Sequence, residues 1–269
     1  HGFYGSGRVK IGKKGDFATS PSLSPDFSGL LAVQIADWFK QLNRINFTGL
    51  PLSLVELGPG YGSLAFDLIV AIEKIIPELL SNIELIFVEN NFSMIQKQKN
   101  KFRNFSIVPI YWRSIDELVD SPVVGIILAN EFLDALPVER IIFENNKLYR
   151  QGVALIERYP HSYLTYKKLP ISKNFSNSIR YVSESIGFAI PPKEAHDGWC
   201  SEWHNNLEPW LTKASKSLIY GSMLFIDYFI EAKRYYTSSR SSGTILAYKD
   251  QTASSELLFE PGYWDLTSH

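Results

Sequence analysis

The feature that most constrains this chain is a short apolar run followed at once by three glycines at alternate positions. Residues 52–57 are mostly apolar, and Gly58, Gly60 and Gly62 come directly after them. Apolar residues at helical spacing begin next, so the segment indicates a buried strand, a glycine turn and a helix. Such a turn brings the backbone close to a ligand and points helix N–H groups at it. The sequence therefore predicts an α/β sheet with a ligand site over this turn.

The spacing of the glycines distinguishes between cofactors. A dinucleotide fingerprint has glycine at its first, third and sixth positions, but the sixth position here is Ser63. An acidic residue followed by glycine at alternate positions, as in the run from Glu56 to Gly62, is typical of S-adenosylmethionine enzymes with a Rossmann-like sheet. The alternative is a glycine-rich turn that binds no ligand.

Composition sets the broad class. The 269 residues are 45% hydrophobic and can bury a large core, as one α/β domain with or without an inserted cap. The net charge of −1 gives no general electrostatic reason to expect nucleic acid or an anionic membrane as a partner. No uncharged apolar stretch reaches the ~20 residues that span a bilayer. The single Cys200 excludes an internal disulfide framework.

Helices and strands alternate along much of the chain. Ser24 and Pro25 are a typical N-cap and first residue of a helix. Further strands are predicted at 83–88, 106–111, 123–129 and 218–228, with helices at about 64–77, 92–101 and 202–217. This alternation predicts a parallel, doubly wound sheet with helices on both faces. Residues 138–195 are expected to form an insertion between the fourth and fifth strands, and residues 231–243 a mobile loop.

Two acidic residues flank the predicted cofactor turn. Glu89 follows the second strand, where a carboxylate can accept both ribose hydroxyls of a cofactor. Glu56, near the end of the first strand, can orient the turn or reach the cofactor amino group through water. A surface acid at Glu89 and a buried acid at Glu56 that accepts backbone N–H groups are the alternatives.

A second group of polar residues follows the fourth strand. Asn130, Glu131 and Asp134 offer one amide and two carboxylates at the edge of the sheet where ligands of open α/β proteins bind. They could hold a cationic or amine-bearing acceptor, and a guanidinium pairs well with carboxylates. Alternatively, Glu131 and Asp134 cap the following turn.

No metal site is expected. His196, Cys200 and His204 are close in sequence, but their spacing fits no standard zinc pattern. Neither a P-loop nor a nucleophile elbow is present.

Taken together, several segments resemble one family of S-adenosylmethionine-dependent methyltransferases. That family includes the mitochondrial complex I assembly factor, which is a protein arginine methyltransferase, and many bacterial relatives. The resemblance covers almost the whole chain and is carried by residues 15–21, 56–62, 130–137, 226–228, 243–245 and 265–267. It departs from the family at Ser22, Ala18 and Phe229.

The resemblance implies a class I methyltransferase fold in a single domain, residues 1–269. S-adenosyl-L-methionine would lie over Gly58, Gly60 and Gly62 with its ribose near Glu89. An N-terminal arm, residues 1–23, would fold over the cofactor and make Asp16 and Thr19 cofactor-binding residues. The chain ends where relatives continue toward the last sheet strands, so these are expected to be missing.

The function implied is methylation of arginine, or another nitrogen, in a protein acceptor, with Glu131, Asp134 and Asn130 as the catalytic set. A methyltransferase for small molecules and an inactive assembly or binding protein are the alternatives. No targeting segment is visible, which predicts a cytoplasmic protein of bacterial type, whereas eukaryotic relatives are mitochondrial. Neither the acceptor nor the oligomeric state can be named from the sequence.

Overall fold

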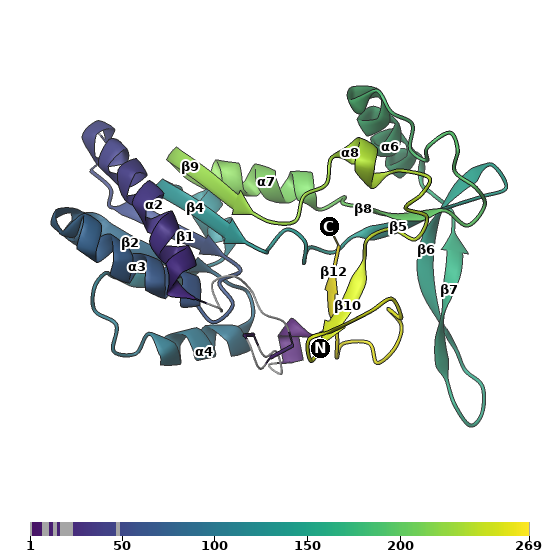
Figure 1. Cartoon of the computed structure of the whole chain (residues 1–269), viewed down its shortest axis with the longest axis horizontal. Coiled ribbons are helices and arrows are strands. Elements are labelled where there is room, and N and C mark those ends of the chain that lie inside the picture. Colours follow the sequence, from purple (N-terminus) through teal and green to yellow (C-terminus); the bar gives the residue numbers. More distant parts are fainter. Residues whose placement is uncertain (1, 7–10, 13–14, 17–23, 47–48, 269) are drawn as a thin grey trace.

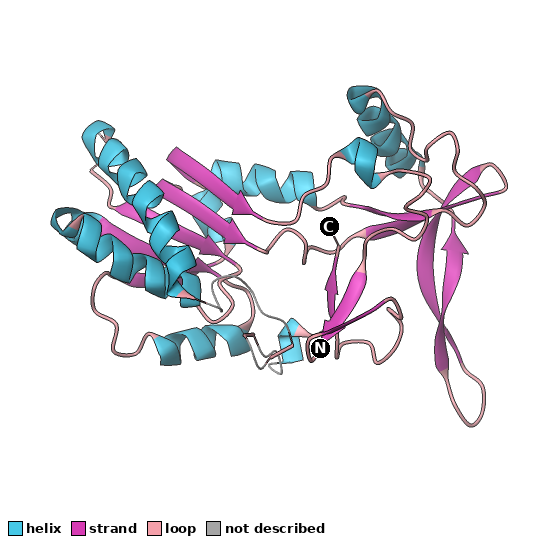
Figure 2. Cartoon of the chain, in the orientation of Figure 1, coloured by secondary structure: helices cyan, strands magenta, loops and turns pink. Residues whose placement is uncertain are grey.

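A computed structural model describes residues 2–6, 11–12, 15–16, 24–46 and 49–268. Its centre is a five-stranded parallel sheet in the order β3-β2-β1-β4-β9 (Figure 2). The strands are β1 (Leu52–Leu57), β2 (Ile83–Val88), β3 (Ile110–Arg113), β4 (Val123–Asn130) and β9 (Leu218–Ile226). The predicted parallel α/β sheet is confirmed. Because the strand order reverses between β1 and β4, a crevice is expected at the carboxyl ends of these two strands.

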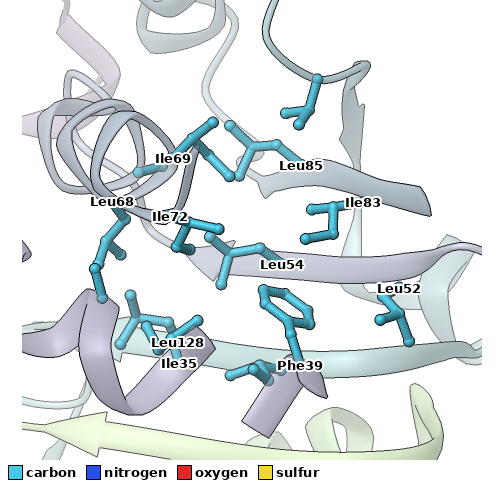
Figure 3. Close-up of a cluster of buried hydrophobic side chains, with 14 of the residues drawn as sticks. Ile35, Phe39, Leu52, Leu54, Leu68, Ile69, Ile72, Ile83, Leu85 and Leu128 are labelled. Carbon is cyan, nitrogen blue, oxygen red and sulfur yellow. The ribbon is translucent and has the colours of Figure 1, made fainter. Parts of the chain in front are cut away.

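Helices cover both faces of this sheet. Helices α2 (Pro25–Ile45) and α3 (Ser63–Ile75) pack against one face, and α5 (Ile115–Asp120) and α7 (Leu207–Lys216) against the other. Strand residues alternate between the two cores, as the period of two of a strand requires: Leu54 joins the first core and Val55 the second. Figure 3 shows the first core, where side chains of α2, α3, β1, β2 and β4 meet.

The first helix begins as the sequence predicts. The Ser24 hydroxyl accepts the N–H of Asp26 at 3.1 Å, and Pro25 is the first helical residue. The buried side of α2 includes Ile35, Phe39 and Leu42. Helix α4 (Phe92–Lys101) also has its predicted bounds, with Asn91 as N-cap.

The third strand starts later than predicted. It was expected at 106–111 but is Ile110–Arg113. Val108 is buried and Ile107 packs against the first core, so these side chains contribute to the core from a loop. Pro109 has no N–H to donate to a ladder, although its carbonyl accepts Leu85 N–H at 2.9 Å. Helix α5, which was not predicted, follows through a capping box formed by Ser114 and Glu117.

The chain between β4 and β9 forms a second, antiparallel sheet in the order β7-β6-β5-β8. Its strands are β5 (Glu139–Glu144), β6 (Lys147–Ile156), β7 (Tyr163–Leu169) and β8 (Cys200–Trp203), and α6 (Lys173–Ile186) accompanies them. In Figure 1 this sheet and the parallel sheet occupy opposite ends of the molecule. The helix expected at 202–217 begins only at Leu207, because residues 202–203 pair with β5 in β8 instead.

The segment after β9 is more ordered than predicted. Residues 231–243 were expected to be a mobile loop, but they contain α8 (Ala232–Tyr235). Tyr235 and Tyr236 are buried with Trp199 and Trp203, so aromatic packing holds this segment in place. A third small sheet, in the order β11-β10-β12, follows: β10 (Leu246–Lys249), β11 (Thr252–Ser254) and β12 (Asp265–Thr267).

Two short 3₁₀ helices complete the described secondary structure, η1 (Tyr4–Ser6) and η2 (Pro77–Asn82). Strands β10 and β12 lie between the two larger sheets, and η1 is close to them (Figure 1). Within the described part of the chain, no helix is both long and apolar enough to cross a bilayer.

Candidate cofactor and acceptor site

A cavity of about 600 Å³ lies at the carboxyl ends of β1 and β4, where the strand order reverses. The glycine turn after β1 forms one part of its wall, and the segment after β4 forms another. The wall also includes residues from η1 and from the β10-β12 sheet, which no local sequence pattern connects to the turn. The polar and aromatic side chains in the wall are Tyr4, Glu56, Tyr61, Ser63, Glu89, Asn130, Glu131, Phe132, Asp134, Tyr228, Tyr248, Asp265 and Thr267.

The three glycines of the turn are needed for different reasons. All have positive φ: 59° at Gly58, 54° at Gly60 and 73° at Gly62. A Cβ on Gly58 would overlap the ring of Phe132, and one on Gly62 would lie 2.7 Å from Phe102 Cε2. A Cβ on Gly60 would come within 3.0 Å of Ile11 Cδ1, the flexible end of a side chain. Gly58 and Gly60 line the cavity, so ligand can approach their backbone directly.

Glu56 is a buried acid that faces this cavity. It is 4% exposed, and burial raises the pKa of its carboxyl to about 8. Its Oε2 is fully buried and has no hydrogen-bond partner among the described residues. An orphaned buried oxygen in a cavity wall is suited to receive a hydrogen bond from a ligand N–H.

Glu89 is held at the cavity by a buried glutamine. Its Oε1 accepts Asn91 N–H at 2.9 Å, and Gln98 Nε2 lies 3.4 Å from its Oε2. Gln98 Nε2 also donates to the Gly60 carbonyl at 2.8 Å, and Trp112 Nε1 donates to Gln98 Oε1 at 2.9 Å. Burial raises the pKa of Glu89. Gln98 thus connects the glycine turn to the acid after β2.

The segment after β4 is fixed by a carboxylate from the next strand. One oxygen of Asp227 accepts the N–H groups of Phe132 at 3.1 Å, Leu133 at 2.8 Å and Asp134 at 3.4 Å. Glu131 N–H donates to the Ile226 carbonyl at 2.8 Å, and the φ of Glu131 is +48°. A left-handed backbone at a non-glycine residue costs energy and persists only where its surroundings enforce it. The bonds to β9 enforce it here.

The end of the cavity formed by the segment after β4 is acidic. Burial, and next the neighbouring charges of Asp227, Glu131 and Asp265, raise the pKa of Asp134 to about 7. Burial raises the pKa of Asp265 to about 6. Among the described residues that line the cavity there is no lysine, arginine or histidine. A cationic ligand would therefore relieve the repulsion between these carboxylates.

Most of the predicted site residues meet in this one cavity. It is lined by Glu56, Glu89, Asn130, Glu131, Asp134, Gly58 and Gly60. Gly62 does not line it and lies against the rings of Phe102 and Phe87. Asp16 is buried and does not line the cavity: its carbonyl accepts Gln251 N–H at 2.9 Å, on the turn between β10 and β11, and its charge contributes to the raised pKa of Asp265. Thr19, Ser22 and Ala18 lie outside the described residues.

Other residues of the site were not predicted. Asp227 lies inside the strand predicted at 218–228, whereas in the structure it directly follows β9, so an earlier strand end would have shown the same signal as Glu89. Gln98 lies in a polar helix and carries no signal in the sequence. Tyr4, Tyr248 and Asp265 reach the cavity only through tertiary contacts. No group of His, Cys, Asp or Glu side chains suited to a metal ion occurs in the part of the chain that the structure describes.

Comparison with known proteins agrees with this fold. The model of a family described as "Putative S-adenosyl-L-methionine-dependent methyltransferase" matches residues 30–269. The chain therefore belongs to this family of S-adenosylmethionine-dependent methyltransferases.

Two of the named relatives are animal proteins. The mitochondrial protein arginine methyltransferase NDUFAF7 homolog of Caenorhabditis elegans is 33% identical over 162 residues, which cover 52% of this chain and 35% of the relative. Human mitochondrial protein arginine methyltransferase NDUFAF7 is 30% identical over 153 residues, which cover 49% of this chain and 34% of that protein. The matched region is thus about a third of the length of these curated relatives.

A solved structure shows the same fold. A COG1565 superfamily member from Burkholderia thailandensis, bound to S-adenosyl-homocysteine, superposes with a TM-score of 0.76 at 21% identity. The match covers 97% of this chain and 63% of that one. The Rossmann-like methyltransferase fold is confirmed.

Proposed function

We propose that this cavity binds S-adenosyl-L-methionine at its glycine-turn end and methylates a cationic nitrogen, an arginine of a protein, at its acidic end. The observation that carries the proposal is the cavity itself, which joins the glycine turn of β1 to the acidic segment after β4 with no basic residue in its described wall. The names of the worm and human relatives, which are protein arginine methyltransferases, support the choice of acceptor.

The residues present fit this cofactor. The backbone of Gly58 and Gly60 would contact it, the Glu89 carboxylate would accept its ribose hydroxyls, and the orphaned Glu56 Oε2 would accept a hydrogen bond directly or through water. S-adenosylmethionine supplies an electrophilic methyl group on a positively charged sulfur. The acidic wall suits that charge as well.

The acceptor would be held by the segment after β4. Carboxylates pair with a guanidinium through charge-assisted hydrogen bonds, so Glu131 and Asp134 would fix its orientation and draw its charge away from the attacking nitrogen. Asn130 would donate or accept a further hydrogen bond. A carbon–nitrogen bond forms and the carbon–sulfur bond breaks, and the nitrogen loses one proton. Asp134, whose pKa is raised to about 7, is suited to take up that proton.

Positioning would supply most of the rate acceleration, because methyl transfer from a sulfonium is an in-line displacement that needs little covalent help. The acidic cavity favours a cationic acceptor over a neutral one, and the names of the worm and human relatives favour a protein arginine over the small amine or hydroxyl compound of the first alternative. An inactive assembly or binding protein, the second alternative, would keep the fold, with or without the cofactor, and lack turnover. The cytoplasmic location expected from the sequence stays a prediction, and the names of the worm and human relatives assign those proteins to mitochondria.

The test has two stages. Isothermal titration of the protein with S-adenosylmethionine measures cofactor binding, and transfer of a labelled methyl group to proteins of a cell lysate measures activity. The Glu131→Gln variant should bind cofactor within twofold of wild type and lose turnover by at least tenfold. Absence of cofactor binding contradicts both enzyme functions, and unchanged turnover in Glu131→Gln removes that residue from the catalytic set.

A further inference from the structure

A carboxylate from the far end of the chain also faces the acceptor end of the cavity. Asp265 is the first residue of β12, where it pairs with Tyr248 of β10, and both residues line the cavity together with Glu131 and Asp134. Asp265 is only 6% exposed. A buried acid in a cavity wall has lost its hydration and gains from a cation that enters the cavity.

The position of Asp265 is fixed relative to Asp134. Ser268 N–H, just after β12, donates to the Asp134 carbonyl at 3.0 Å. Tyr4 of η1 packs against the same acids: burial and then the charges of Asp265, Asp134 and Glu131 raise the pKa of its hydroxyl. Three segments that are distant in sequence therefore converge here, and two of them bring a carboxylate to one space.

Aromatic rings complete this end of the cavity. Tyr4, Tyr228 and Tyr248 line it from three different segments. Tyrosine faces attract cations, and they do so more strongly where water is excluded. The described wall therefore combines acids and aromatic faces without a cationic side chain, which suits a positively charged acceptor better than a neutral one of the same shape.

We propose that Asp265 is a specificity-determining residue of the acceptor site, where its carboxylate, with those of Glu131 and Asp134, selects a positively charged acceptor over a neutral isostere. This inference rests on the proposed function. A purely structural role is the competing explanation, because Thr267 Oγ1 lies 3.5 Å from Asp265 Oδ2 and Tyr4 hydrogen-bonds to Asp265.

The test uses the peptide acetyl-Gly-Gly-Arg-Gly-Gly-amide and its citrulline counterpart, since citrulline has the shape of arginine without the charge. Binding of each peptide is measured by titration calorimetry at pH 8 with S-adenosylhomocysteine saturating, for wild type, Asp265→Asn and Glu256→Gln. Asparagine keeps the size of aspartate and one acceptor oxygen for the Tyr4 or Thr267 hydroxyl, and it removes the negative charge. Glu256 is an exposed acid of the same C-terminal segment and does not line the cavity, so its variant is the matched control.

Wild type and Glu256→Gln should prefer the arginine peptide, and Asp265→Asn should reduce that preference about tenfold, the factor that corresponds to about 1.4 kcal/mol. If Asp265 had a structural role alone, Asp265→Asn would weaken the binding of both peptides equally and leave the preference for arginine unchanged. That result would overturn the assignment of Asp265 while the proposed function stands. If the wild-type protein binds S-adenosylhomocysteine but does not prefer the arginine peptide over the citrulline peptide, the proposal of a cationic acceptor is overturned, and this inference with it. Failure to bind S-adenosylhomocysteine would contradict the proposed function at its cofactor end.

Discussion

The carboxylate of Asp227 accepts the N–H of Leu133 at 2.8 Å, across 94 residues of sequence. The same oxygen accepts the N–H groups of Phe132 and Asp134. Two neighbouring strands of the parallel sheet, β4 and β9, are thereby tied together at the point where the candidate acceptor residues begin. Glu131, with a φ of +48°, comes directly before the three N–H groups that Asp227 accepts, so we expect the geometry of the proposed acceptor site to depend on a residue outside the segment after β4.

Replacing Asp227 by Asn should impair turnover more than cofactor binding. Asparagine presents an N–H₂ group or a weaker, neutral acceptor to three N–H donors, and charge-assisted hydrogen bonds are about twice as strong as neutral ones. We expect kcat/KM for the acceptor to fall at least tenfold while the dissociation constant of S-adenosylmethionine changes less than twofold. Steady-state kinetics and calorimetry measure the two, and circular dichroism verifies the fold. Equal losses of cofactor affinity and turnover would argue against a positioning role.

Replacing Gly58 by Ala should weaken cofactor binding strongly. Alanine is strained at a φ of 59°, and its Cβ would displace the ring of Phe132, which packs against Trp210 at a centroid distance of 4.5 Å. We expect a loss of about 1–3 kcal/mol in the free energy of unfolding and a cofactor affinity reduced at least tenfold.

The matched control for that variant is Gly187→Ala. Gly187 has a φ of 62° at the end of α6, but a Cβ there would meet no atom within 4 Å. It should cost stability through backbone strain alone and leave cofactor affinity unchanged. A similar loss of affinity in both variants would contradict a local role of Gly58.

The pH dependence of stability should carry a contribution from Glu56. The pKa of Glu56 is raised from 4.5 to about 8 in the folded protein, so the folded state binds this proton more tightly than the unfolded chain. The associated stability is fully present below about pH 4.5 and is lost as the pH rises toward 8. Glu56→Gln removes this titration. The difference between the free energies of unfolding at pH 5 and pH 8, measured by urea denaturation, should therefore be smaller in the variant, and an equal difference would contradict the assignment.

Binding of a cationic acceptor should strengthen as the pH rises from 5.5 to 8. Over this range Asp265, with a pKa of about 6, and Asp134, with a pKa of about 7, become ionised. Each carboxylate that ionises adds attraction for a cation. Titration with the arginine peptide should show this increase, whereas the citrulline peptide should show little change. A pH profile of the same shape for both peptides would indicate a conformational effect in place of charge.

Local patterns in the sequence predicted the elements around the cofactor end of the site. The apolar run 52–57, the glycines after it and the acid at Glu89 lie within one strand–helix–strand unit, so their relative positions follow from secondary structure alone. The parallel sheet followed in the same way from the alternation of strands and helices. Prediction was poorer where side chains in loops take part in the core. Val108 was expected in the third strand but joins the core from the loop before β3, and Tyr235 and Tyr236 are buried in a segment that was expected to be a mobile loop.

The acceptor end was decided by tertiary structure. Nothing in the sequence places Asp265 or Tyr4 beside Asp134, because their proximity depends on how the small C-terminal sheet pairs and where it packs. The hydrogen bonds that Asp227 accepts from residues 132–134 likewise depend on β9 lying beside β4. The glycine turn and its acids could be found from the sequence because short-range periodicity encodes them. The negative charge at the acidic end of the cavity arises from contacts between distant segments, which only the folded chain brings together.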